Sequence, residues 1–211
     1  MEHLDKLTGN RFARFTHIKS MTTPLPNNEA ERLAVLREYQ ILDTAPDREF
    51  DLITALASRI CGTPIALISL VDERRQWFKS NIGLSVSETN RNVAFCGHAI
   101  LQREVLHVSD AKMDKRFADN PLVTGNPHIR FYAGAPLVTE KGLALGTVCV
   151  LDQKPRTLTQ EQQESLALMS QLAMSLLDFR KKLREISKVA SEREWLISEL
   201  QRTVDEKGGA S

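Results

Sequence analysis

One stretch constrains the fold of this chain more than any other: the 48 residues from Thr159 to Glu206 contain no glycine and no proline. Such a run exceeds the length of an ordinary globular helix and predicts a single long helix. A heptad seam can be placed along it, and ten of its eleven core positions are apolar, with Arg193 as the exception. The seam predicts a parallel homodimer, whose interface residues are expected to be Leu176, Phe179, Leu183, Ile186, Ala190, Ile197, Leu200 and Val204.

The alternative is a long helix that packs on its own domain. This alternative fits the first half, where the apolar residues form a broader band than a two-position stripe. It fits the second half poorly, because a globular body of this size ends near residue 180. The sequence therefore favours a coiled coil over residues 179–206, after a globular region.

Composition and charge exclude several classes of protein. Hydrophobic residues make up 42% and charged residues 26%, which is typical of a globular protein and excludes bulk disorder. With 28 Lys and Arg against 27 Asp and Glu, the net charge of +1 gives no field to recruit nucleic acid or an anionic membrane. No apolar run is long enough to span a bilayer, and the first twenty residues lack a secretory apolar core. We expect a cytoplasmic protein with neither nucleic acid nor membrane as partner.

Hydrophobic periodicity divides the chain into four regions. Residues 1–28 are predicted to be an irregular leader, 29–178 a globular domain, 179–206 the coiled-coil helix and 207–211 a flexible tail. Within the domain, helical patterns precede a buried strand at 64–71 and its antiparallel partner at 76–82. A short helix follows at 95–101, then a short strand at 104–108. A hairpin is expected from strands 130–138 and 143–152.

Several short strings carry a resemblance to a known family. They are Ile41–Thr44, Ala66–Asp72, Gln76–Ser80, Phe95–Ile100, Arg116–Val123, Phe131–Pro136 and Leu145–Asp152. In this order the chain resembles a GAF domain, of the subgroup found at the front of bacterial sensor histidine kinases and diguanylate cyclases. The resemblance covers residues 29–178 and implies an α+β, α/β/α layered fold with a central, roughly six-stranded antiparallel sheet and helices on both faces. It also implies a small-molecule pocket on one face of that sheet.

Cys96 and His98 form the most conspicuous local pair. A thiol and an imidazole two residues apart can act as nucleophile and base or as two metal ligands, but both arrangements lack further partners here. We therefore predict no catalytic residue and no metal site. A phytochrome-type bilin site would have the two residues adjacent, and nothing selects a haem ligand, so no cofactor is required and neither haem nor bilin is expected.

A small-ligand pocket is the better-supported hypothesis. Aromatic residues can supply apolar walls, and convergent polar groups can orient a ligand. Arg130 suits a carboxylate or phosphate, although a surface ion pair with Asp110 or Asp119 explains it equally well. The predicted ligand-binding residues are Arg130, Tyr132, His98, Cys96, Trp77, Asp110 and Phe131.

The resulting prediction is a sensory module that is not an enzyme. A small molecule bound in the pocket would be sensed and signalled through a dimeric helix to a histidine kinase, a response regulator or a diguanylate cyclase. Residues 190–204 also resemble the helix that opens the dimerisation region of one class of histidine kinase, with Arg202 where that class has a phosphate-accepting histidine. Two alternatives remain open: a ligand-free adaptor that pairs with a kinase or response regulator, and a thiol-dependent small-molecule reductase.

Overall fold

The structure is a computed structural model that describes residues 23–208, and the side chains of residues 23–202. Most of the predicted leader lies outside these residues, as do residues 209–211 of the predicted tail. The domain boundaries at 28, 178 and 206 therefore stay predictions. In chain order the elements are α1 (Glu29–Glu38), α2 (Arg48–Cys61), β1 (Ile65–Val71), β2 (Arg75–Ile82), β3 (Glu88–Asn90), η1 (Arg91–Val93), α3 (Phe95–Ala99), β4 (Leu106–Val108), α4 (Pro121–Thr124), β5 (Phe131–Val138), β6 (Ala144–Asp152) and α5 (Gln160–Gly208).

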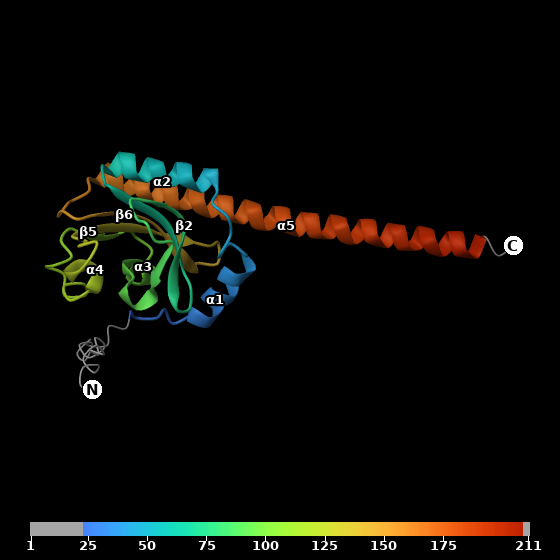
Figure 1. Cartoon of the computed structure of the whole chain (residues 1–211), viewed down its shortest axis with the longest axis horizontal. Coiled ribbons are helices and arrows are strands. Elements are labelled where there is room, and N and C mark those ends of the chain that lie inside the picture. Colours follow the sequence, from blue (N-terminus) through green and yellow to red (C-terminus); the bar gives the residue numbers. More distant parts are fainter. Residues whose placement is uncertain (1–22, 209–211) are drawn as a thin grey trace, which may run out of the picture.

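A six-stranded antiparallel sheet forms the centre of the domain, in the order β3-β2-β1-β6-β5-β4. Every residue of β1 and of β6 is buried, because helices or loops cover both faces. Helices α2 and α5 lie on one face, and α3 and α4 lie on the other (Figure 1). The predicted fold class, with its antiparallel sheet and long C-terminal helix, is confirmed.

Alternation along the strands separates two apolar cores. On the face covered by α2 and α5, Ile68 and Trp77 pack with Phe50 of α2. On the opposite face, Leu67 and Phe78 pack with residues of α3 and of the segment around α4. Neighbouring residues of one strand therefore belong to different cores, as the two-residue period of a strand requires.

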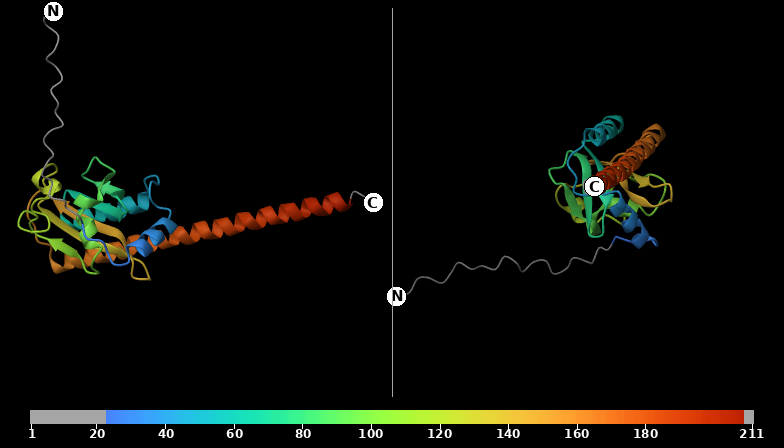
Figure 2. Two further views of the ribbon diagram at one scale, coloured as in Figure 1. Left: turned by 90° about the horizontal axis from the view of Figure 1, so that it is seen from below. Right: turned by 90° about the vertical axis from the view of Figure 1, so that its right-hand side faces the viewer.

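Helix α5 is 49 residues long and changes its surroundings along its length. Its first turns bury Leu166, Ala173 and Leu177 against the sheet. From Glu185 to Arg202 every side chain except that of Glu199 is exposed, and this part stands clear of the domain (Figures 1 and 2).

The predicted interface residues of α5 divide accordingly. Leu176 is half-buried and packs against the core of its own domain, since it lies in the part of α5 that covers the sheet. Side chains at the other described positions are exposed, and the side chain of Val204 lies outside the described residues. Dimerisation itself stays a prediction. The exposed positions are Phe179, Leu183, Ile186, Ala190, Ile197 and Leu200.

A cluster of polar contacts, here called the exit clamp, holds α5 where it leaves the domain. The Tyr39 hydroxyl donates to Asp178 at 2.5 Å, and Lys181 pairs with Glu38 at 2.6 Å. Arg180 forms an ion pair with Asp47, the N-cap residue of α2. The clamp thus joins α5 to the end of α1 and to the start of α2.

A second charged cluster joins α1 to η1, the short helix that follows β3. Glu29 accepts hydrogen bonds from Arg32 at 2.8 Å and from Arg91 of η1 at 2.5 Å. Burial alone would raise the pKa of the Glu29 carboxyl, but these hydrogen bonds outweigh burial and lower it to about 2. None of the described helices combines the length and the apolar character needed to cross a membrane.

We predict that Gly146→Ala destabilises the domain strongly. A Cβ atom at this position would lie 1.9 Å from the backbone oxygen of Ser69, so β1 and β6 would have to separate at the centre of the sheet. Urea unfolding should show a loss of about 3 kcal/mol in the free energy of unfolding. Gly62→Ala is the control: its positive φ of 62° costs about 1–2 kcal/mol, but its Cβ meets nothing closer than 4.0 Å. If both variants lost the same free energy of unfolding, the predicted clash between a Cβ at position 146 and the backbone of Ser69 would be contradicted.

The lowered pKa of Glu29 makes stability depend on pH in acid. Between about pH 4.5 and pH 2 the unfolded chain binds a proton here that the folded chain does not, so stability falls as the pH falls. Because solvent partly screens the carboxylate, we expect Glu29→Gln to cost about 1–2 kcal/mol at neutral pH and almost nothing near pH 2. Denaturant titrations across this range measure the difference. Glu31→Gln, an exposed neighbour on α1, should leave the profile unchanged, and a pH-independent cost for Glu29→Gln would refute the linkage.

Candidate functional site

A cavity of about 380 Å³ lies on the sheet face that carries α3 and α4. Its walls are mainly apolar and aromatic, with a few polar side chains, which is the usual make-up of a small-molecule site. The lining includes Leu67, Gln76, Phe78, Leu84, Thr89, Phe95, Cys96, Leu122, Ile129, Tyr132, Cys149 and Leu151.

Aromatic stacking builds one wall of this cavity. The Phe95 ring of α3 stacks on Phe117 at a centroid distance of 4.2 Å and on Tyr132 of β5 at 5.2 Å. Gly134 makes room for the tyrosine, because a Cβ there would lie 2.1 Å from the Tyr132 hydroxyl oxygen. The wall is therefore fixed by close packing between α3 and β5.

Buried sulfur and hydroxyl groups meet at the base of the cavity. The Cys96 sulfur accepts hydrogen bonds from Tyr132 at 3.3 Å and from Thr147 at 3.1 Å. Thr147 also lies 3.2 Å from the hydroxyl of Ser69, and the Cys96 and Cys149 sulfurs are 3.7 Å apart. This group joins α3 to the three central strands β1, β5 and β6.

The two thiols of this group differ in acidity. Burial opposes ionisation of Cys96, but hydrogen bonds from its neighbours, Cys149, Thr147 and Tyr132 among them, outweigh it and lower the pKa of the thiol to about 7. Burial and the adjacent Cys96 raise the pKa of Cys149 well above its ordinary value. Tyr132 and Thr147 both donate to the Cys96 sulfur, which favours its thiolate form.

Two polar atoms in the wall formed by β2 and β3 have no hydrogen-bond partner among the described residues. They are the Oε1 atom of Gln76, a residue only 5% exposed, and the Oγ1 atom of Thr89, which is paired with Gln76 across the strands. Buried polar atoms are nearly always satisfied in folded proteins. A bound molecule that donates hydrogen bonds would satisfy this wall.

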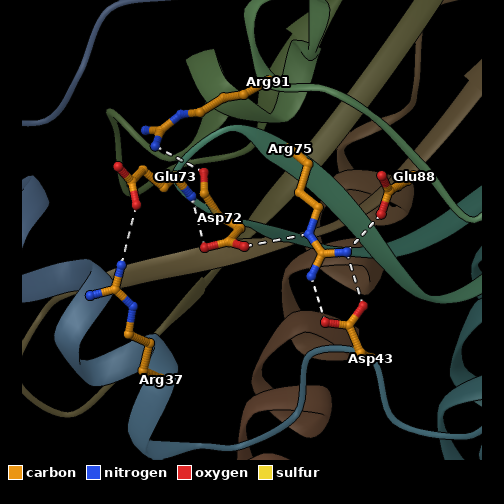
Figure 3. Close-up of polar contacts among 7 residues, drawn as sticks. All are labelled: Arg37, Asp43, Asp72, Glu73, Arg75, Glu88 and Arg91. Atoms are coloured by element: carbon orange, nitrogen blue, oxygen red, sulfur yellow. Dashed lines mark hydrogen bonds and ion pairs between the residues drawn. The ribbon is translucent and has the colours of Figure 1, made fainter.

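Ion pairs fix the edge of the sheet that forms this wall. Arg75 binds Asp43 with both NH groups, at 2.9 and 2.6 Å, and Glu88 of β3 at 2.7 Å (Figure 3). Arg91, immediately after β3, donates to the backbone oxygen of Asp72 at 3.0 Å. β3 has only three residues. The guanidinium group of Arg75 holds its first residue, Glu88, and the guanidinium group of Arg91 holds the chain directly after its last residue.

The structure brings only two of the predicted ligand-binding residues, Cys96 and Tyr132, into the cavity. Trp77 and Phe131 belong to the core on the opposite face, so the predicted set cannot line a single pocket. The physical reason is strand alternation: Phe131 precedes Tyr132, and Trp77 precedes Phe78, so the members of each pair point to opposite faces.

The charged members of the predicted set lie outside the lining as well. Arg130 donates two hydrogen bonds to Asp110, at 2.7 and 2.5 Å, which is the ion pair that the sequence offered as the alternative. His98 is half-buried against the edge of Phe117, and burial lowers its pKa. Whether any of these residues binds a ligand stays a prediction.

Sequence reasoning missed Gln76, Thr89 and Cys149 as cavity residues. The strand pattern could have predicted that Gln76 lines the cavity, because Gln76 shares a face of the strand with Phe78. The position of Cys149 next to Cys96 depends on how α3 packs on β6, and no local pattern signals that packing.

Solved structures with this fold include the GAF domain of an Acinetobacter phosphoenolpyruvate-protein phosphotransferase, at 16% identity and a TM-score of 0.54 over 74% of this chain and 95% of that one. The PixJ GAF domain of Thermosynechococcus elongatus matches at 12% identity and a TM-score of 0.54, over 76% and 95%. A type II free methionine-R-sulfoxide reductase from Thermoplasma acidophilum matches at 13% and 0.52, over 67% and 94%. At these identities the likeness establishes the fold alone.

A curated relative corrects one prediction. A cyclic di-GMP phosphodiesterase of Pseudomonas aeruginosa is 49% identical over 135 residues, which are 64% of this chain and 23% of that protein. The sequence predicted a chain that is not an enzyme. This prediction is contradicted by the relative, whose name is that of an enzyme, although the chain spans less than a quarter of its length.

The family assignment rests on the sheet, on its two helical layers and on a direct match of sequence. The family model described as "GAF domain" matches residues 45–177, well over half of the chain. The chain belongs to the GAF domain family.

Proposed function

We propose that this chain is a cytoplasmic, homodimeric regulatory module that binds a small molecule in the α3/α4-side cavity and acts through α5 on the turnover of cyclic di-GMP. The single observation that carries this proposal is the continuity of α5. The same helix covers the sheet with Leu166 and Leu177 and then extends, exposed, from Glu185 onwards. A change in sheet packing therefore reaches the exposed part without crossing a flexible joint.

Contacts across the sheet support a path from the cavity to α5. In β2, Phe78 lines the cavity, while its neighbour Lys79 lies on the other face. The buried Lys79 ammonium donates to Thr44 at 2.9 Å and to the backbone oxygen of Ala45 at 2.7 Å. This segment leads into Asp47, the partner of Arg180 in the exit clamp. A ligand that shifts Phe78 would thus act on the point where α5 leaves the domain.

The lining of the cavity indicates the chemistry of the ligand. Leu67, Phe78 and Phe95 favour an apolar or aromatic body. The unpartnered oxygens of Gln76 and Thr89 favour N–H or O–H donors on its rim. Among the described residues that line the cavity the charged one is Glu88, and none is an arginine or lysine, so a neutral molecule fits better than a phosphate or carboxylate.

The phosphodiesterase relative supports the signalling output. Its name concerns cyclic di-GMP, and the match covers 135 residues, or 64% of this chain. Between the partners that the sequence left open, it favours a cyclic di-GMP enzyme over a histidine kinase or a response regulator. The three free cysteines of the described chain are typical of a reducing compartment, which supports the cytoplasm.

Exposed apolar side chains support the dimer. Leu183 is 46% exposed, and Ile186, Ile197 and Leu200 are each more than half exposed, at heptad spacing along a helix that the described residues leave uncovered. On the body, Leu172 of α5 is exposed too. A second copy of this chain, aligned in parallel, would bury this stripe.

We predict that Leu183→Asp disrupts the dimer. A carboxylate in the seam faces its own copy in a dry environment, so the dissociation constant should rise by about 100-fold or more. Analytical ultracentrifugation over a range of concentrations measures it. Lys188→Asp places the same side chain on the outer face of the helix and should leave the dimer intact. A monomeric wild-type chain, or equal effects of both substitutions, would contradict the dimer.

We predict opposite effects of Gln76→Leu on the empty protein and on ligand binding. Removing an unpartnered buried acceptor should raise the stability of the empty protein, whereas a lost hydrogen bond should weaken binding about tenfold. Native mass spectrometry of the freshly purified chain identifies the co-purifying molecule, and calorimetry with that molecule measures its affinity. Gln102→Leu, on an exposed glutamine outside the cavity, is the control. An empty wild-type chain with no stabilising metabolite would reject the sensor and favour an adaptor.

A further inference from the structure

The two sulfurs at the base of the cavity lie close together without being bonded. Cys96 Sγ and Cys149 Sγ are 3.7 Å apart, whereas a disulfide requires about 2.05 Å. Cys96 belongs to α3, a helix of only five residues, and Cys149 to the central strand β6. Closing the gap needs a movement of less than 2 Å, and a short helix at the surface of the sheet can move that far more readily than a central strand can.

The surroundings of Cys96 suit a nucleophilic sulfur. Two hydroxyl groups, those of Tyr132 and Thr147, donate hydrogen bonds to it, and such donors stabilise a thiolate more than a thiol. Cys149 lies beside it as a second thiol, in the position of a resolving group. Both cysteines belong to the lining of the cavity, so a small uncharged oxidant needs only a local movement of α3 to reach their buried sulfurs.

The third cysteine provides an internal contrast. Cys61 ends α2 on the opposite face of the sheet and is buried in the helix-side core. Among the described residues no other cysteine is hydrogen-bonded or disulfide-bonded to it, and burial raises the pKa of its thiol to about 11. It has neither a partner nor an activating donor.

We infer that Cys96 and Cys149 form a thiol pair that hydrogen peroxide oxidises to an intramolecular disulfide across the base of the cavity. The Cys96 thiolate attacks one peroxide oxygen, the O–O bond breaks, and the departing hydroxide takes up a proton as water. The resulting sulfenic acid is attacked by Cys149: the S–S bond forms, the S–O bond breaks, and a second water leaves. The two thiols lose two electrons and two protons in total, and one peroxide becomes two waters.

The disulfide would change the cavity itself. It would bind α3 covalently to the centre of the sheet, and Cys96 would lose the thiolate to which Tyr132 and Thr147 donate. The cavity would then respond to peroxide as well as to a bound ligand, and both would act through α3 and the sheet. This inference does not depend on the proposed ligand, because it requires only the two cysteines and their access to the cavity.

The test uses the full chain, reduced and freed of reductant, then treated with hydrogen peroxide while folded. Free thiols are alkylated, the disulfide is reduced, and the released thiols receive a second, distinguishable label before peptide mass spectrometry. We expect the intact mass to fall by two hydrogens, the second label to appear on Cys96 and Cys149, and Cys61 to carry the first. Amide exchange in residues 95–99 should slow after oxidation and recover on reduction.

Three variants separate the roles of the cysteines. Cys61→Ser should form the disulfide like the wild type, whereas Cys96→Ser should lose peroxide reactivity altogether. Cys149→Ser should stop at a sulfenic acid on Cys96 that dimedone traps. The wild-type experiment alone can overturn the inference: three unmodified thiols, disulfides only between chains, or the second label on Cys61 would each refute it, whether or not the variants fold.

Discussion

The structure depends on a sheet whose central strands are buried on both faces. β1 and β6 carry apolar side chains above and below, so neither face can be left to water, and the chain must provide a cover for each. Two long helices supply one cover and a set of short helices and loops the other. Between this second cover and the sheet lies the cavity of about 380 Å³.

The polar groups at the base of this cavity come from α3 and from the two central strands β1 and β6. Thr147, Ser69 and Cys96 satisfy one another at the base, and that mutual satisfaction holds α3 against β1 and β6. Gln76 on the neighbouring wall has no such partner for its oxygen. A satisfied base and an unsatisfied wall are the arrangement expected of a preformed site, in which the base sets the shape and the wall contacts the ligand.

Much of the architecture was predictable from the sequence, because hydrophobic period and helix breakers act locally. The strand from Ile65 to Val71 and the uninterrupted helix after Gln160 are determined by nearby residues. The site was less predictable, for two different reasons. Phe131 was assigned to a pocket because it is aromatic, although its alternation with Tyr132 places it on the other face. Cys149 lies in a buried strand, but its approach to Cys96 across 53 positions depends on tertiary packing.

The exit clamp gives the free part of α5 the properties of a lever. Beyond Arg184 the helix continues for 24 residues to Gly208, which at 1.5 Å per residue is about 36 Å. With its fulcrum at Asp178 and Arg180, about 43 Å from Gly208, a tilt of about 5° sweeps the distal tip through about 4 Å, more than the radius of the helix backbone. Sub-ångström adjustments beside Asp47 are thereby magnified at the tip, far from the chemistry that starts them.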